Sequence, residues 1–432
     1  MRTMLSALLI CLFYRCHKTP QRSTATAYEH RSCPNASRTS DRRSLRFVTQ
    51  LDAEEDVEIV FSQEVQTNRA LRCRSSVDDP HCPNCQALCN CDYRRYIARI
   101  NCGFVDSDWT TRDGPGEVFD ATRIFPMHPL GWELKGPVPE PVVEFPQLAN
   151  GLLSVYGSHF AHFSTEILPG LIFFLRHLPE NVPILVDLRG VGKRWTELLV
   201  ERGLASEDRW VPWSPNTTYR AQSLYFQAVQ FKEKSRQNLV PGPMLEWQLL
   251  RTEIPCSWRP SLMNYLVREA FSAMTNKPCM KPQILILYRN ETQARRAINH
   301  ESVVSSCRQH FPAHSVREFV GADLSIQESI RIFQETQVFV TPHGAGLAYM
   351  QFLQAGAAVI EIGYDQGSSI PWPAGYYEGN SLSLSLHYFY SVAQGDHHTP
   401  IHINVDELTW SLHQAVKVST PAVTCNFKSA LP

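Results

Sequence analysis

Residues 338–361 read Val338-Phe-Val-Thr-Pro-His-Gly-Ala-Gly-Leu-Ala-Tyr-Met-Gln-Phe-Leu-Gln-Ala-Gly-Ala-Ala-Val-Ile-Glu361. This order predicts a buried strand, a turn that holds a histidine, a short apolar helix and a second strand closed by a carboxylate. Gly344 and Gly346 allow positive φ angles and a close approach of the backbone to a ligand. The Leu347 amide would open the helix, whose free N–H groups suit an anion. The stretch predicts either a phosphate-binding turn or a tight turn with a capping histidine.

Length and composition limit the class of protein. The 432 residues suffice for two or three domains with apolar cores. Hydrophobic residues make up 43% and charged residues 19% of the chain, which is ordinary for a globular protein. Because the formal net charge is −1, bulk electrostatics give no reason to expect a nucleic-acid partner.

The N-terminus has the pattern of a targeting signal. The segment from Met4 to Tyr14 is apolar apart from Ser6, with basic residues before and after it. It is shorter than a bilayer span, which needs about 20 residues, and has the size of a signal-peptide core. The basic residues that follow it equally allow a short type II membrane anchor. From Thr19 to about Ser44 the chain is rich in Arg, Ser and Thr, which predicts a disordered stem.

Cysteines and glycosylation sequons point to a lumenal compartment. Six of the 13 cysteines lie between Cys73 and Cys102. The run from Cys82 to Cys91 allows a metal-binding knuckle, but Cys89 and Cys91, its second pair, have only one residue between them. We therefore favour a local disulfide knot. Three sequons begin at Asn35, Asn216 and Asn290. Together with the leader, they predict a protein of the secretory pathway.

The expected elements divide the chain into four parts. Residues 1–44 form the signal or anchor with the stem, and residues 45–150 a Cys-rich and loop-rich region. Residues 151–255 and 256–420 form two Rossmann-like domains. Pro and Gly are dense in 113–147, which predicts extended loop there.

In the first Rossmann-like part, strands and helices take turns. Strands are expected at 152–156, 183–187 and 224–231, and helices at 163–177 and 194–202. Pro169 should kink or divide the longer helix. The alternation predicts a parallel sheet with right-handed crossovers.

The second part is a complete doubly wound α/β unit. Strands are expected at 282–288 and 316–320, helices at 299–310 and 326–336, followed by the stretch 338–361 and a last helix from about Asp406. Leu324 and Ser325 should cap the helix 326–336.

A loop rich in arginine follows the strand at 282–288. It holds Arg289, Arg295, Arg296, Asn299 and Glu301. Ligands bind beyond the carboxyl ends of parallel strands, and arginine forks match phosphate oxygens. The loop therefore predicts diphosphate recognition; for Arg295 or Arg296 singly, solvated surface charge is the simpler interpretation.

Further polar residues follow other strands of this part. His343 lies at the same predicted sheet edge and could bind a phosphate or ribose, or move a proton. Glu361 ends the next strand and is placed to hold a ribose diol. The alternatives are a structural cap for His343 and a solvent-facing charge for Glu361.

The first part offers a His/Glu pair. His162 and Glu166 share one helix face, with His159 just before them. They suit acceptor binding or base catalysis, or simple charge placement at a helix N-terminus. Asp106 and Asp108 have Asp-x-Asp spacing but lie in the Cys-rich region, so we do not assign them to a metal site.

The ordered motifs from about Leu152 to about Val416 resemble glycosyltransferase family 61. The segment 162–169 resembles the family's His…Glu/Asp…Leu-Pro segment, and 289–301 its Arg-rich block. The stretch 342–361 resembles its most characteristic signature, and 387–388 and 405–408 its later motifs. Tyr349 stands where many members have a polar residue.

The resemblance implies a GT-B fold, with an acceptor-side domain at 151–255 and a donor-nucleotide domain at 256–420. It implies inverting transfer of N-acetylglucosamine or xylose from a UDP-sugar to a hydroxyl of a glycan or protein. No cofactor is implied, and a metal is usually not obligatory. Members act in the endoplasmic reticulum or Golgi. The candidate catalytic residues are His162 and Glu166; the candidate donor-binding residues are Arg289, Arg295, Arg296, Asn299, Glu301, His343, Gly344, Ala345, Gly346, Leu347 and Glu361.

Two rival functions stay open at this point. A catalytically silent lumenal binding module could keep the fold and lose the reaction. A dinucleotide oxidoreductase is disfavoured, because no Gly-x-Gly-x-x-Gly with a downstream acidic residue follows any predicted strand. The loop 363–379 holds Trp372, Tyr376 and Tyr377, which suit stacking on a sugar or ordinary packing.

Overall fold

The structure, a computed structural model, describes most of the second half of the chain and parts of the first. The described residues are 46–47, 54–65, 93–105, 118–120, 123–125, 142–152, 158–215, 217–231, 239–241, 264–272, 282–289, 294–321, 324–365 and 377–419. The predicted leader, stem, Cys82–Cys91 run, Asp106–Asp108 pair, sequon asparagines, Trp372 and Tyr376 lie outside them. Within the described part, no helix has the length and apolarity to cross a membrane.

The second sheet confirms the predicted α/β unit. Its order is β12-β11-β13-β14-β15-β16. Its strands are β11 (Gln283–Leu287), β12 (Ser315–Phe319), β13 (Thr336–Pro342), β14 (Ala358–Asp365), β15 (His387–Gln394) and β16 (His402–Ile403). The first five pair in parallel, and only β16 is antiparallel. Parallel strands buried on both faces explain the nearly continuous apolar runs in this part of the sequence.

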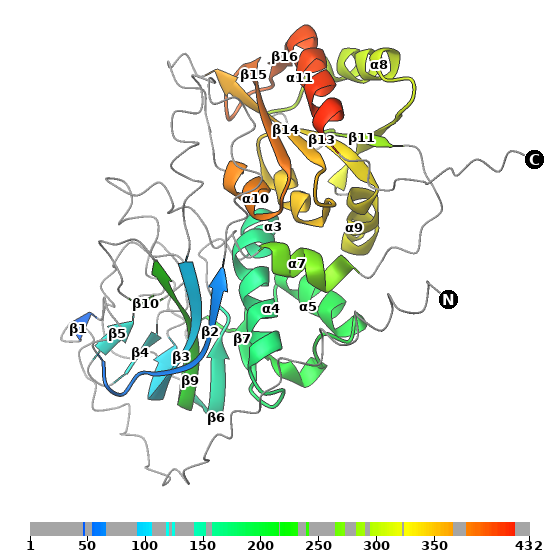
Figure 1. Ribbon diagram of the computed structural model, residues 1–432. Helices are drawn as coiled ribbons and strands as arrows, with labels where there is room; N and C mark the ends of the chain where they lie inside the picture. Colours follow the sequence, from blue (N-terminus) through cyan, green and yellow to red (C-terminus); the bar gives the residue numbers. More distant parts are fainter. Residues whose placement is uncertain are drawn as a thin grey trace, which may run out of the picture. The chain divides into compact units, whose positions relative to one another are not determined.

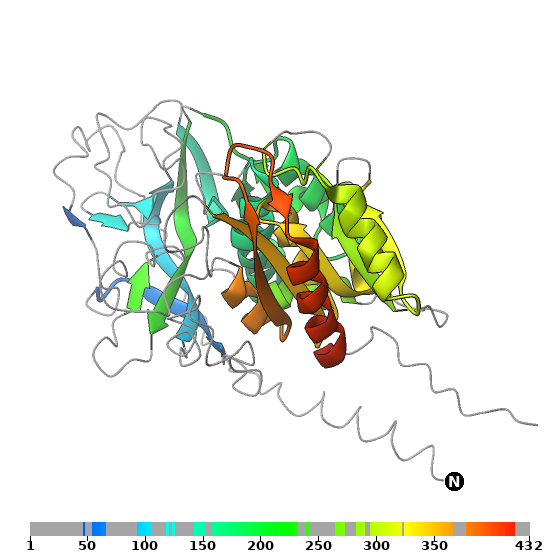
Figure 2. The ribbon, with the colours of Figure 1, turned by 90° about the horizontal axis from the view of Figure 1, so that it is seen from above.

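Helices cover both faces of this sheet. On one face α8 (His300–His310) and α11 (Val405–Val418) pack against β11, β13 and β14; Figure 2 shows the two helices, yellow-green and red, side by side. On the other face lie α9 (Ile326–Gln334), the 3₁₀ helix η9 (Ala345–Phe352) and α10 (Glu378–Ser383) (Figure 1). The predicted cap at Ser325 is confirmed, because Ser325 and Glu328 form a reciprocal capping box.

The first sheet is mixed. Its main order is β1-β5-β4-β3-β9-β6-β7-β8, with β10 paired to β9 and β2 to β3. The strands are β1 (Arg46–Phe47), β2 (Glu58–Val65), β3 (Tyr93–Val105), β4 (Val118–Phe119), β5 (Arg123–Phe125), β6 (Val142–Asn150), β7 (Ile184–Val186), β8 (Trp210–Pro212), β9 (Thr218–Phe231) and β10 (Leu239–Pro241). The group β9-β6-β7-β8 is parallel, as the alternation predicts, whereas β2, β3 and β10 extend it with antiparallel pairs.

The prediction of loop over 113–147 is wrong. β4, β5 and most of β6 lie there, and ordered structure precedes residue 152. Pro146 explains the error, because it lies inside β6 and interrupts the pairing with β9: Phe145 pairs with Ala221 and Gln147 with Ser223. Proline cannot donate a ladder hydrogen bond, and it survives at such an irregularity.

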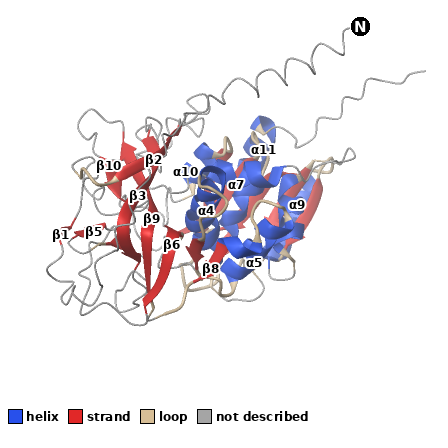
Figure 3. Ribbon diagram, turned by 90° about the horizontal axis from the view of Figure 1, so that it is seen from below, coloured by secondary structure: helices blue, strands red, loops and turns tan. Residues whose placement is uncertain are grey.

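Helices lie on one side of the first sheet (Figure 3). α4 (Leu168–His177) and α5 (Val191–Glu201) share a buried core with residues of β3, β6 and β9. The same core continues through α7 (Asn264–Phe271) to the second sheet. Tyr349 is buried there and lies 4.7 Å from the Phe160 ring and 4.9 Å from the Phe333 ring. Tyr349 thus packs against both halves of the chain.

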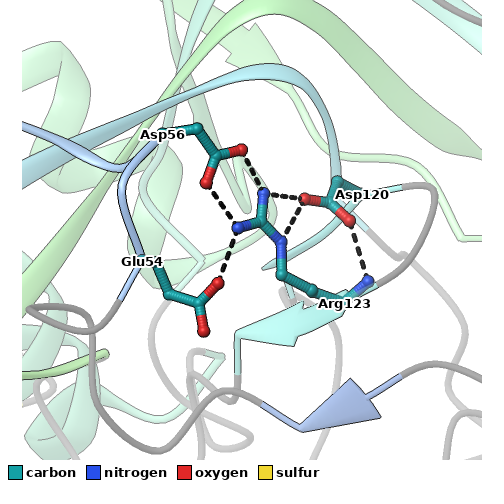
Figure 4. Close-up of polar contacts among 4 residues, drawn as sticks. All are labelled: Glu54, Asp56, Asp120 and Arg123. Carbon is teal, nitrogen blue, oxygen red and sulfur yellow. Dashed lines mark hydrogen bonds and ion pairs between the residues drawn. The ribbon is translucent and has the colours of Figure 1, made fainter.

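A four-residue ion cluster anchors the segment before β2 (Figure 4). The Arg123 guanidinium donates to Asp56 at 2.5 and 2.6 Å and to Glu54 at 2.8 Å. It also donates from Nε to Asp120 at 2.8 Å. The hydrogen bonds to Asp56 raise the pKa of Arg123 despite burial. Three carboxylates around one guanidinium fasten residues 54–56 to the β4–β5 hairpin.

Candidate active site

The strand order of the second sheet reverses between β11 and β13. β12 lies on one side of β11 and β13 on the other, and in such sheets ligands bind beyond the carboxyl ends of the two strands at the reversal. Arg289 follows β11, and His343 comes directly after β13. The two loops meet: a Cβ atom added to Gly344 would lie 2.6 Å from Nη1 of Arg289.

Gly344 makes room for two guanidinium groups. Its φ of 150° is one that side chains other than glycine rarely adopt. The same added Cβ would lie 3.3 Å from Nη1 of Arg295. Two neighbouring guanidinium forks beside an open backbone match the oxygens of a diphosphate.

Arg295 is held in place by its backbone. It has a φ of 59°, and its N–H donates to the Thr399 carbonyl at 2.7 Å. Its Nη1 donates to the His343 carbonyl at 3.3 Å. Its Nε is buried and has no hydrogen-bond partner in the described part of the chain. Arg295 therefore retains donor capacity at the edge of the site.

His343 is fixed by a buried carboxylate. Its Nδ1 lies 2.5 Å from Oε1 of Glu361, and the Tyr388 hydroxyl donates to Oε2 at 2.6 Å. Burial, then the charge of Glu361, raises the pKa of Tyr388, so its hydroxyl keeps its proton. The Glu361 carboxylate thus holds the imidazole of His343 through Nδ1.

Tyr377 connects this cluster with the first half. Its ring centroid lies 5.6 Å from that of His343. Burial raises the pKa of Tyr377, and the charges of Glu361 and Glu166 raise it further. The charges of Glu166, from a helix of the first half, and of Glu361, from β14, therefore both act on Tyr377.

Glu166 and His162 form the predicted pair. Nδ1 of His162 lies 2.7 Å from Oε1 of Glu166. The side chain of His162 is 30% exposed and that of Glu166 only 8%. Burial alone would lower the pKa of His162, but the hydrogen bond and charge of Glu166 outweigh it and raise the pKa. His162 is the accessible member, and Glu166 orients it.

The helix that carries the pair is irregular at this point. α3 (Phe160–His162) leads into a π-helical turn, η4 (Phe163–Ile167), before α4 begins. The Leu168 N–H donates to the Phe163 carbonyl, five residues back. The predicted disturbance around Pro169 is therefore a wide turn just before the proline, and such turns are frequent at functional sites.

Three expectations about the glycine turn need correction. The helix after Gly344 is 3₁₀, and the Leu347 N–H donates to the Gly344 carbonyl at 3.0 Å, so it is not free for an anion. The Leu347 side chain is fully buried in the core. Gly346 serves packing, because an added Cβ would lie 2.2 Å from Cδ1 of Leu287. Ala345 is the exposed residue of the turn.

Other predicted residues have structural partners. The side-chain amide of Asn299 bonds both backbone groups of Ile403 at 2.8 and 3.1 Å. The Arg296 carbonyl accepts from the Ile401 N–H at 2.9 Å. Glu301 is exposed in the first turn of α8, where a negative charge is favourable. Glu361 lies inside β14, not at its end. Donor contact by these four stays a prediction.

Sequence reasoning missed two residues beside the site. The hydroxyl of Tyr364 lies 2.5 Å from Nδ1 of His397, and the Tyr364 ring is 6.5 Å from that of His343. Tyr364 follows Glu361 by three residues, and His397 lies in the β15–β16 loop. A His-His pair in a loop was the available signal. Within the described ranges, no group of three or more His, Cys, Asp or Glu side chains could hold a metal ion.

Comparison with known proteins gives a family match for the part of the chain that carries most of this site. Residues 160–360 match the sequence profile of the family described as Glycosyltransferase 61. Over this segment the chain is similar to glycosyltransferase 61 domains. No curated protein sequence matches the chain. The match spans less than the resemblance from Leu152 to Val416, and it includes His162, Glu166 and the Gly344 turn. Glu361, Tyr364 and His397 lie beyond its end.

Proposed function

We propose that this protein is an inverting glycosyltransferase that transfers a sugar from a UDP-sugar to a hydroxyl of a glycan or protein. The observation that supports the donor site most directly is the meeting of Arg289, Arg295 and Gly344 at the strand-order reversal. The family resemblance favours N-acetylglucosamine or xylose as the sugar. The predicted leader favours the lumen of the endoplasmic reticulum or Golgi.

The donor diphosphate would lie on the two guanidinium groups. As the bond between the anomeric carbon and the UDP oxygen breaks, negative charge grows on the leaving diphosphate. Arg289 and Arg295 stabilise this charge more strongly in the transition state than in the ground state, which lowers the barrier. No metal or other cofactor is assigned to this step.

The acceptor hydroxyl would meet His162. The acceptor oxygen attacks the anomeric carbon from the face opposite UDP, so the configuration inverts, and its proton passes to Nε2 of His162. Glu166 at 2.7 Å from Nδ1 stabilises the imidazolium that forms. The raised pKa of His162 suits a base that works near neutral pH. The two halves would face each other as in a GT-B enzyme.

A panel of UDP-sugars tests the proposal. We expect the purified full-length protein to hydrolyse one of them slowly in the absence of acceptor, and Arg289→Ala to lower the rate by about a hundredfold, as loss of a transition-state donor does. Arg308→Ala is the matched control, because Arg308 is exposed on α8 and pairs with Glu318 at 3.4 Å. Full turnover by Arg289→Ala would refute the donor site.

The same panel separates the enzyme from its rival. A catalytically silent binding module would bind UDP and hydrolyse no UDP-sugar. Silence across the panel with retained UDP affinity would therefore favour the binding module. Absence of both binding and turnover would overturn the sugar-nucleotide site itself.

A further inference from the structure

The loop between β15 and β16 lies beside the donor site, and the mechanism above does not use it. The Asp396 carboxylate accepts from the N–H groups of His398 at 2.6 Å and Thr399 at 2.9 Å, which fixes the turn. The Thr399 carbonyl accepts from the Arg295 N–H at 2.7 Å. This turn presents His397 at a defined place next to one of the two arginines.

Tyr364 orients the ring of His397. The Tyr364 side chain is fully buried, and its hydroxyl lies 2.5 Å from Nδ1 of His397. The centroid of the Tyr364 ring lies 6.5 Å from that of His343 and 5.9 Å from that of His397, so the ring is close to both imidazoles. His397 is only half-buried, and its neighbour His398 is exposed.

The surroundings of His397 set its protonation. Burial lowers its pKa, and the positive charge of Arg295 lowers it further, followed by His398, His343 and Arg289. His397 is therefore neutral at neutral pH. In the tautomer in which the Tyr364 hydroxyl donates to Nδ1, the single ring proton of His397 resides on Nε2.

Arg289, Arg295 and His343, which all act on the pKa of His397, carry N–H donors. Arg289 and Arg295 already meet at Gly344, and His343 has Nδ1 on Glu361. Glu361, the carboxylate of this cluster, is occupied by His343 and Tyr388. N–H donors and positive charge in the neighbourhood of His397 suit an anion with several oxygens.

We infer that His397 is a further donor-binding residue, which donates a hydrogen bond from Nε2 to a phosphate oxygen of the sugar nucleotide. The inference rests on the proposed function, since it names another contact of the same diphosphate. Tyr364 is its positioning residue: it holds Nδ1 and thereby directs the Nε2 proton outward.

Calorimetric titration of the full-length protein with UDP and with uridine tests the inference. His397→Ala should weaken UDP binding by about ten- to hundredfold, the loss expected for one hydrogen bond to a charged group. Uridine affinity should stay within about twofold, because uridine has no phosphate. His398→Ala, the exposed neighbour, should bind both ligands like the wild type.

Two conservative variants distinguish the loss of this contact from a folding defect. His397→Gln keeps an N–H donor near the position of Nε2 and should restore most of the UDP affinity. Tyr364→Phe keeps the buried ring, removes the hydroxyl that orients His397, and should weaken UDP binding without changing uridine binding.

The outcomes are distinct. If the wild type binds UDP and His397→Ala binds it as tightly as His398→Ala, the contact is refuted and the proposed function stands. Equal weakening for UDP and uridine would show a structural role for His397 and also refute the contact. If the wild type binds no UDP, the inference and the proposed function fall together.

Discussion

The carboxylate of Glu361 has no exposed surface, and its Oε1 lies 2.5 Å from Nδ1 of His343. Its other oxygen accepts a hydrogen bond from Tyr388 at 2.6 Å. Leaving a buried carboxylate without partners is costly, so both contacts are maintained together. The relationship makes His343 a rigid side chain at the strand-order reversal, with one ring nitrogen assigned.

Glu361→Gln should impair turnover more than it impairs folding. The amide has the same size but carries no charge, so it holds the imidazole of His343 less firmly than the carboxylate does. We expect kcat/KM for the donor to fall by roughly 10- to 100-fold, as for other carboxylates that orient a histidine. The measurement is UDP-sugar hydrolysis, with thermal unfolding of the same preparation.

Tyr388→Phe is the companion variant. It removes one hydrogen bond from Glu361 and leaves the contact to His343. A smaller loss than for Glu361→Gln is expected, because the carboxylate that holds His343 is unchanged. If both variants lost activity equally, and only in proportion to lost stability, the orienting role of Glu361 would be wrong.

Gly344→Ala should disturb the donor site in two ways, by a steric clash and by backbone strain. An added Cβ would lie 2.6 Å from Nη1 of Arg289 at a φ of 150°. The guanidinium must then move, and we expect at least a tenfold rise in the donor KM.

Gly203→Ala is the matched control, because Gly203 has a φ of 65° and nothing within 4 Å of its added Cβ. Alanine at position 203 would have the backbone strain but no steric clash. The strain should lower the free energy of unfolding by about 1–2 kcal/mol. The donor KM of this variant should be unchanged. A Gly344→Ala enzyme with wild-type KM would show that the arginines do not contact the donor.

The edge of the second sheet could be predicted from the sequence for a simple reason. Strands buried on both faces give unmistakable apolar runs, and the residue after each run falls at the same sheet edge. The sequence predicts Arg289 and His343 at the same sheet edge for this reason. The capping box of Ser325 is equally local, since it needs only residues three apart.

Contacts that depend on register could not be predicted. The pair Glu361–Tyr388 follows from the alignment of β14 with β15, and Tyr364–His397 from the loop after β15. Asn299 has the sequence pattern of a ligand residue, yet its amide bonds Ile403, 104 positions along the chain. In the first sheet, Pro146 concealed a strand because proline usually excludes one.

The His162–Glu166 pair predicts a pH-dependent part of the stability. Since the folded pKa of His162 is raised above its ordinary value of about 6.5, the pair's contribution is complete below that pH. It is lost as the pH rises through the folded pKa. The difference in Tm between wild type and His162→Gln should therefore be largest in mild acid and shrink in alkali. Thermal unfolding over a series of buffers measures it.

Glu166→Gln serves as the check on this assignment. It removes the charge and hydrogen bond that raise the pKa of His162, so it should abolish the same pH-dependent difference. Adding His162→Gln to it should then have little further effect, because the two residues act as a pair. A difference that persists in the Glu166→Gln background would contradict the coupling.

Arg123→Ala should destabilise the first sheet strongly. The side chains of Glu54 and Asp120 are each only 10% exposed, and both lose their cation in the variant. Removing one member of a buried ion cluster costs about 3–5 kcal/mol, because charges remain buried and unpaired. Lys193→Ala is the control, since Lys193 and Glu197 form an exposed pair at 3.7 Å worth at most about 1 kcal/mol. Urea unfolding compares the two variants; equal midpoints would mean that the cluster does not anchor residues 54–56.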